Sequence, residues 1–101
     1  MKMLLIVFRE LMAEQVHALM KEYDVTAFTE LHNVSGRGET GPTIQFFLSA
    51  GANRIILAAV PESAAYRLID GFTRFRTELA RRQGDDPVPL HVFVLPCEQV
   101  V

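Results

Sequence analysis

The amino-acid sequence predicts an α+β fold, in which two helices cover one face of a four-stranded antiparallel sheet. Four apolar or β-branched segments have the length of strands, and two amphipathic segments between them have helical periodicity. Their order, strand-helix-strand-strand-helix-strand, is that of the ferredoxin-like fold. The chain has 101 residues, half of them apolar, so we expect one domain spanning residues 1–101.

The first half of the chain predicts a strand, a helix and a second strand. Residues 3–8 (MLLIVF) form a continuous apolar run, which favours a strand buried on both faces. Apolar residues then recur at helical spacing from Met12 to Tyr23, and we expect Asp24 to end that helix. Residues 25–34 (VTAFTELHNV) are rich in β-branched and aromatic side chains and predict the second strand.

The second half predicts a strand, a long helix and a final strand. Residues 54–60 (RIILAAV) form the third strand, and Ser63 is expected to cap a helix whose apolar stripe continues to Ala80. A turn follows at residues 84–87 (GDDP). Residues 90–96 (LHVFVLP) then form the fourth strand.

Residues 36–53 interrupt this pattern with a connection of a length that is uncommon in compact domains and usually functional or disordered. It opens with GRGETG, which has the G-x-G-x-x-G spacing of a dinucleotide-binding turn. We reject that interpretation, because the sequence leaves no room for the crossover helix that such a turn requires. Two interpretations stay open. The glycines either only permit tight turns, or the connection is functional, with Arg37 attracting an anion and Glu39 and Thr40 supplying polar contacts.

Over essentially its whole length, the sequence resembles the PII signal-transduction superfamily, in one of its divergent PII-like branches. The similarity begins with a Lys2-led first strand, continues through DVTAFTE and SGRG, and ends with HVFVLPCEQVV. The Gly-x-Gly at residues 36–38 stands where the family's T-loop begins. The resemblance implies a homotrimer with clefts between neighbouring subunits, each binding an adenine nucleotide or another small effector. It also implies a T-loop that docks onto a transporter, an enzyme or a regulator.

The resemblance places candidate effector contacts by position. Residues 36–38 would line the cleft, Thr26 and Thr29 would face it from a neighbouring subunit, and residues 84–86 lie where the family has its second phosphate-binding loop. With the polar residues that follow Gly38, the candidate effector-binding residues are Thr26, Thr29, Gly36, Arg37, Gly38, Glu39, Thr40, Gly84, Asp85 and Asp86. Phe46 and Phe47 are either a partner-docking tip of the long connection or packing residues across the trimer axis.

The sequence departs from the family pattern at the positions that hold phosphate. The connection at 36–53 is shorter than a classical T-loop and has no tyrosine, which excludes nucleotidylation of a T-loop tyrosine. The second loop reads QGDDPVP, without the family's phosphate-binding lysine, and no C-terminal Arg-x-Arg segment follows. Because charge-assisted contacts are the strong ones, we expect ADP, AMP, cyclic AMP or a small anion to suit the site better than ATP.

A metal-ion sensor or metal-tolerance protein of the same fold is the alternative function. Its candidate ligands are His32, His91 and Cys97, since some PII-like branches are associated with metal handling. His32 and His91 fall on strands that occupy opposite margins of a ferredoxin-like sheet, so they could meet only across a subunit interface. His17, on the first predicted helix, has no ligand spacing to either.

Composition excludes several function classes. A net charge of −2 and a pI of about 5.9 argue against nucleic-acid binding. A local group of arginines lies on the polar face of a predicted helix, where we expect it to be solvated: Arg74, Arg76, Arg81 and Arg82. The one cysteine and the absence of a signal or an apolar span indicate a cytoplasmic protein without direct membrane insertion. No constellation of nucleophile and base is apparent, so we expect a regulator and not an enzyme.

Overall fold

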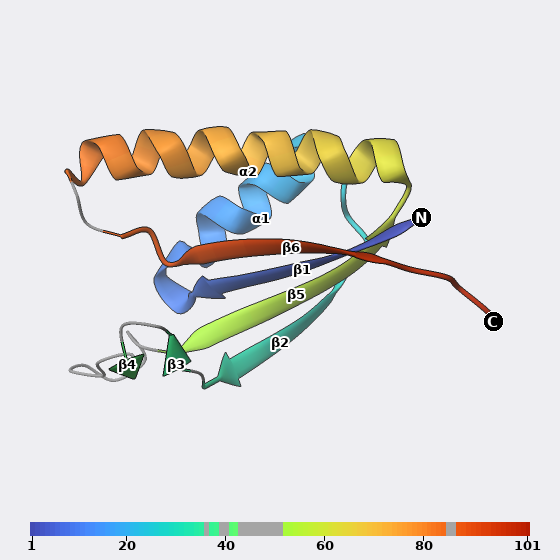
Figure 1. Ribbon diagram of the computed structural model, residues 1–101, viewed down its shortest axis with the longest axis horizontal. Helices are drawn as coiled ribbons and strands as arrows, with labels where there is room; N and C mark the ends of the chain where they lie inside the picture. Colours follow the sequence, from blue (N-terminus) through green and yellow to red (C-terminus); the bar gives the residue numbers. More distant parts are fainter. Residues whose placement is uncertain (36, 39–40, 43–51, 85–86) are drawn as a thin grey trace.

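One antiparallel sheet forms a layer of the molecule, and two helices lie across one of its faces (Figure 1). The computed structural model describes residues 1–35, 37–38, 41–42, 52–84 and 87–101. In chain order the elements are β1 (Lys2–Arg9), the 3₁₀ helix η1 (Glu10–Met12), α1 (Ala13–Glu22), β2 (Thr29–Val34), β3 (Arg37–Gly38), β4 (Gly41–Pro42), β5 (Asn53–Val60), α2 (Glu62–Arg82) and β6 (Leu90–Pro96).

The strand order confirms the predicted fold class. The sheet has the order β2-β5-β1-β6, and each neighbouring pair is antiparallel. The two strands at the margins, β2 and β6, are therefore separated by β5 and β1. With α1 between β1 and β2 and α2 between β5 and β6, this is the ferredoxin-like arrangement. β3 and β4 pair separately, with Arg37 opposite Pro42 and Gly38 opposite Gly41.

The hydrophobic core lies between the helices and one face of the sheet. Alternate residues of β1 point into it, and Leu4, Ile6 and Phe8 are at most 1% exposed. α1 contributes Val16 and Met20, whereas α2 contributes Leu68 and Phe72. Each fully buried side chain of this kind contributes about 1.5–3 kcal/mol, so this face holds the two layers together.

The other face of the sheet has no cover within the described part of the chain, although it is also apolar. The expectation that β1 is buried on both faces is therefore wrong for a single chain, because Met3, Leu5 and Val7 remain half-buried. The strand register places Leu5 between Leu57 and Phe93. We call the apolar residues of this side the open sheet face: Met3, Leu5, Val7, Leu31, Ile55, Leu57, Phe93 and Leu95.

Helix boundaries follow backbone hydrogen bonds more closely than side-chain caps. Asp24 ends α1 as predicted, with a φ of 60°, and the Val25 N–H donates to the carbonyl oxygen of Met20 at 2.8 Å. That bond keeps Val25 in the helix-terminal turn, so β2 begins only at Thr29. The prediction that Ser63 caps α2 is wrong. Pro61 takes the extended N-cap conformation and accepts from the backbone N–H of residue 65, without a side-chain cap.

The helices in the described part of the chain are all too short or too polar to cross a membrane. The arginines predicted to lie on the solvated face of α2 are exposed, as expected: Arg74, Arg76, Arg81 and Arg82. Cys97 is half-buried just beyond the end of β6.

Candidate functional site

A group of charged side chains gathers where β2 and β5 lead into and out of residues 36–53. It consists of Glu10 from η1, His17 from α1, Glu30 from β2 and Arg54 from β5, and we call it the Arg54 network. Arg54 donates from Nε and Nη2 to the two carboxylate oxygens of Glu10, with Nη2 at 2.9 Å from Oε1. Its Nη1 donates to Oε2 of Glu30 at 2.8 Å. The guanidinium therefore bridges two carboxylates that are distant in sequence.

Glu30 occupies the most enclosed position of the network. It lies opposite Ile56 in the register of β2 and β5, so its side chain points toward the helices, and that side chain is only 12% exposed. The second carboxylate oxygen, Oε1, lies 2.8 Å from Nε2 of His17, whose ring stacks on Phe28 with centroids 6.0 Å apart. Both oxygens therefore have partners, as a carboxylate in a largely enclosed position requires.

The two carboxylates and the guanidinium of the network remain charged near neutral pH. Burial would raise the pKa of the Glu30 carboxyl, but hydrogen bonds from Arg54 and His17 outweigh it, so the pKa lies below its ordinary value. The hydrogen bond from Arg54 also lowers the pKa of Glu10. The two carboxylates raise the pKa of Arg54 in turn. The His32 ring stands at the edge of the network, with Nε2 4.0 Å from Oε2 of Glu30.

The Arg54 network joins four elements at the root of the 36–53 connection. A backbone bond adds to it, because the N–H of Glu10 donates to the carbonyl oxygen of Ala52 at 2.9 Å. Together these contacts hold the end of β2 and the start of β5 against η1 and α1. Three donors of Arg54 are taken by carboxylates, so the network is a structural anchor in this conformation and not an open anion site.

The structure describes only part of the predicted effector site. Thr26 is exposed in the segment before β2, and Thr29 is the exposed first residue of β2. Arg37 and Gly38 form β3, and Gly84 follows α2 with a φ of 73°. The remaining candidates lie outside the described residues: Gly36, Glu39, Thr40, Asp85 and Asp86, together with the docking candidates Phe46 and Phe47. The site assignment therefore stays a prediction.

The described candidates fall on different sides of the molecule. Thr29 belongs to β2, at one margin of the sheet, whereas Gly84 lies on the connection to β6, at the other margin. Two strands separate these margins within one chain.

The metal-ligand candidates are also distributed over the molecule. His32 lies on β2 and His91 on β6, at opposite margins of the sheet, and Cys97 follows β6. The described ranges contain no group of three or more His, Cys, Asp or Glu residues that could hold a metal ion.

Sequence reasoning missed the role of Glu10, His17 and Arg54. The available signal was strand alternation, which places Glu30 on the face of β2 that packs under the helices. A carboxylate at such a position needs a cationic or hydrogen-bonding partner. The sequence does not say which of ten Lys and Arg residues supplies it.

Comparison with known proteins identifies the family to which the chain belongs. The model of the nitrogen regulatory protein P-II family matches residues 1–101, so the chain belongs to the P-II family of regulatory proteins, whose members are trimeric signalling proteins. This confirms the resemblance drawn from the sequence. None of the curated proteins compared with the chain matches it.

Solved structures of PII-like proteins match most of the chain. One is CPII, a nitrogen regulatory PII-like protein from Thiomonas intermedia K12 bound to ADP, AMP and bicarbonate. It is 28% identical with a TM-score of 0.71, over 93% of this chain and 82% of that one. Its apo form is 26% identical with a TM-score of 0.63, over 93% and 85%. A PII-like signalling protein from Thermus thermophilus, 18% identical with a TM-score of 0.59 over 93% and 83%, supports the fold alone.

Proposed function

We propose that this protein is a PII-like regulator that binds an adenine nucleotide, together with a small anion such as bicarbonate, in clefts between the subunits of a homotrimer. The observation that carries the proposal is the match over 93% of the chain to a protein solved with ADP, AMP and bicarbonate. ADP and AMP are favoured over ATP, because the QGDDPVP segment lacks the lysine that holds a triphosphate in the family.

Two features of the single chain support assembly through the sheet. The open sheet face exposes Phe93 by 52% and Leu95 by 44%, and exposed apolar patches of this kind mark interaction surfaces. Thr29 lies on β2, at one margin of the sheet, and Gly84 follows α2 on the connection into β6, the strand at the other margin, so a cleft containing both joins two copies. We therefore propose that assembly completes the effector site.

Signalling requires that the effector prefers one conformation of the protein, since only differential affinity shifts an equilibrium. The Arg54 network anchors β2 and β5 on either side of the long connection. We therefore propose that the effector acts on residues 36–53 and leaves the sheet unchanged, and that this segment engages the target protein. No catalytic step is part of the proposal.

Calorimetry on the assembled protein tests effector binding, with ADP, AMP, ATP, cyclic AMP and bicarbonate as separate titrants. We expect ADP or AMP to bind more tightly than ATP. Arg37→Ala should weaken binding about ten-fold or more, the value of one charge-assisted hydrogen bond. Arg67→Ala, which removes an exposed arginine of α2, is the matched control and should bind normally.

One outcome would change only the assignment of Arg37 to the site, whereas another would contradict the nucleotide-binding function. Normal nucleotide binding by Arg37→Ala would remove Arg37 from the site while leaving the function intact. Absence of binding to every nucleotide, with copper or zinc binding that His32→Ala abolishes, would instead establish the metal-sensor alternative.

A further inference from the structure

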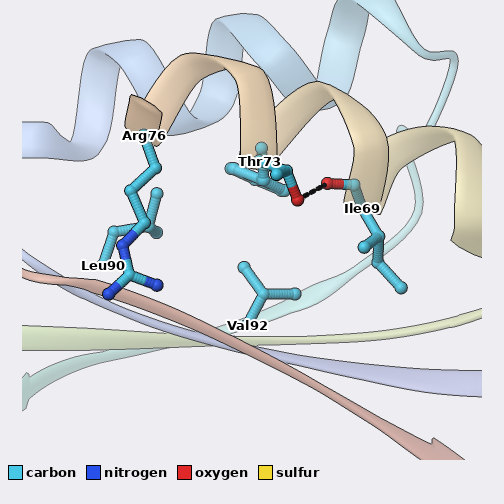
Figure 2. Close-up of a pocket in the computed structure, with 6 residues that line it drawn as sticks. Ile69, Thr73, Arg76, Leu90 and Val92 are labelled. Carbon is cyan, nitrogen blue, oxygen red and sulfur yellow. Dashed lines mark hydrogen bonds between the residues drawn. The ribbon is translucent and has the colours of Figure 1, made fainter. Parts of the chain in front are cut away.

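A hollow lies on the helix side of the sheet, between α2 and the marginal strand β6 (Figure 2). Its volume is about 110 Å³. It is lined by Ile69, Phe72, Thr73 and Arg76 of α2 and by Leu90 and Val92 of β6. None of these residues belongs to the Arg54 network or to the predicted effector site.

The lining is apolar at its base. Phe72 is 2% exposed and Leu90 is 1% exposed, and the half-buried side chains of Ile69 and Val92 pack against the same core. β6 has a neighbour in the sheet on one side only, so no further strand of the described chain covers this margin. The hollow therefore has an enclosed apolar base and lies at a margin of the sheet that no further described strand covers.

Among the described residues of the lining, only Arg76 is charged. The spacing of Ile69, Thr73 and Arg76 places them on one side of α2. Figure 2 shows the side chain of Arg76 extending from the helix toward β6, beside Leu90. No ion pair or hydrogen bond involves Arg76 within the described residues, whereas the hydroxyl of Thr73 donates to the carbonyl oxygen of Ile69 at 2.9 Å. An unpaired guanidinium therefore stands at one end of an apolar hollow.

We propose that this hollow is a second ligand site, which binds a small aliphatic carboxylate. The carboxylate pairs with the guanidinium of Arg76, whose fork of donors matches its two oxygens. The aliphatic body lies between Ile69 and Val92. A cavity of about 150 Å³ takes up one benzene molecule, so the smaller volume of this hollow suits a body of about four carbon atoms.

A nucleotide does not fit this description. Sites for ligands of that size have volumes of roughly 300–1,000 Å³, several times that of the hollow. Inorganic phosphate and bicarbonate would use Arg76 but leave the apolar lining of Ile69, Leu90 and Val92 without a partner. The combination of charge and apolar surface selects a ligand that has both.

Methyl NMR on the full chain tests the site, with 3-methylbutanoate as the probe. We expect saturable shifts of the Ile69, Leu90 and Val92 methyl signals, with a dissociation constant in the millimolar range. Acetate, which lacks the aliphatic body, and 3-methylbutanol, which lacks the charge, should each bind about ten-fold more weakly. Equal binding of the alcohol, or no saturable shift with 3-methylbutanoate, would overturn the proposal.

Variants of α2 separate the site from the rest of the molecule. Arg76→Gln should weaken 3-methylbutanoate binding about ten-fold, whereas Arg67→Gln, the matched control on the same helix, should leave it unchanged. Thr73→Leu places a larger side chain at the mouth and should abolish binding, while ADP titration stays normal in all three variants. A change of the oligomeric mass in Arg76→Gln or Thr73→Leu, measured by light scattering, would show that another copy occupies the hollow and would overturn the ligand assignment.

Discussion

At the scale of single residues, the enclosed carboxylate of Glu30 lies at the centre of the contacts that join η1, α1, β2 and β5. A carboxylate that is only 12% exposed requires compensation, and Arg54 and His17 each supply a donor at 2.8 Å. Arg54 also donates to the carboxylate of Glu10, which adds η1 to the same set of contacts. The result is an electrostatic contact between the first strand's end and the root of the long connection.

The pH dependence of unfolding tests this network. Glu10 and Glu30 have pKa values below their ordinary value of 4.5 in the folded protein. Their contribution is therefore fully present above pH 4.5 and is lost as the pH falls through the lower folded values. Glu30→Gln should reduce the free energy of unfolding at pH 7 by about 1–2 kcal/mol and flatten its decline in acid, as followed by urea titration. The exposed control Glu98→Gln should retain the wild-type decline; equal slopes for wild type and Glu30→Gln would contradict the assignment.

Gly71 shows a steric requirement at the contact of the two helices. A Cβ atom added at Gly71 would lie 2.8 Å from Cζ of Tyr23 and closer still to Cε2, well inside any normal contact distance. The hydroxyl of Tyr23 also accepts a hydrogen bond from Arg74, so a shift of the ring would disturb a second contact.

Gly71→Ala should therefore destabilise the protein by about 1–3 kcal/mol, the usual cost of overpacking, although alanine is the better helix former. Thermal and urea unfolding measure the effect. In a Tyr23→Ala background the ring is gone, and the same substitution should become neutral or stabilising by up to about 1 kcal/mol. An equal loss in both backgrounds would show that Tyr23 is not the obstacle.

At the scale of elements, a residue with left-handed backbone conformation follows the end of each α-helix. α1 is followed by Asp24 with a φ of 60°, and α2 by Gly84 with a φ of 73°. Such a residue turns the chain away from the helix, which lets the next segment return to the sheet. Among the described residues, no atom lies within 4 Å of a Cβ built on Gly84, so its requirement for glycine is purely one of backbone conformation.

Gly84→Ala should destabilise the protein by about 1–2 kcal/mol, the cost of a left-handed conformation for an L-residue. Gln83→Ala, one position earlier, is the matched control and should change the stability little. Chemical denaturation followed by circular dichroism provides the measurement. An unchanged midpoint for Gly84→Ala would mean that the end of α2 relaxes without cost.

At the scale of the whole molecule, the two faces of the sheet differ in what covers them. One face of the sheet is covered by the helices, whereas the other presents Leu5, Leu57 and Phe93 side by side. Apolar surface of this extent is stabilised by association, because removing it from water is favourable. This is the surface through which we propose that the trimer forms.

Phe93→Glu should dissociate the trimer by placing a charge on the open sheet face. Tyr66→Glu is the matched control. The side chain of Tyr66 is about as exposed as that of Phe93, at 47% and 52%, but it lies on α2 and not on the open sheet face. Light scattering should give a trimer mass for the control and a monomer mass for Phe93→Glu, which should also lose ADP binding. A Phe93→Glu trimer would contradict the assignment of this face.

The fold was predictable because its signals are local. The apolar run of residues 3–8, the helical periodicity before Asp24 and the strand at residues 90–96 each depend on neighbouring residues, and the structure confirms all three elements. The incorrect prediction that Ser63 caps α2 also came from a local pattern. Ser63 has the chemistry of a helix cap, but the backbone of Pro61 already provides the N-terminal turn.

The sequence by itself determined the order of the elements and the family, because these depend on periodicity and on motifs along the chain. Only the tertiary structure decided that Arg54 pairs with Glu10 and Glu30, and that Arg76 stands over an apolar hollow. Arg54 and Glu10 are 44 positions apart in the chain. A contact at that separation depends on strand register and helix placement, which no local pattern encodes.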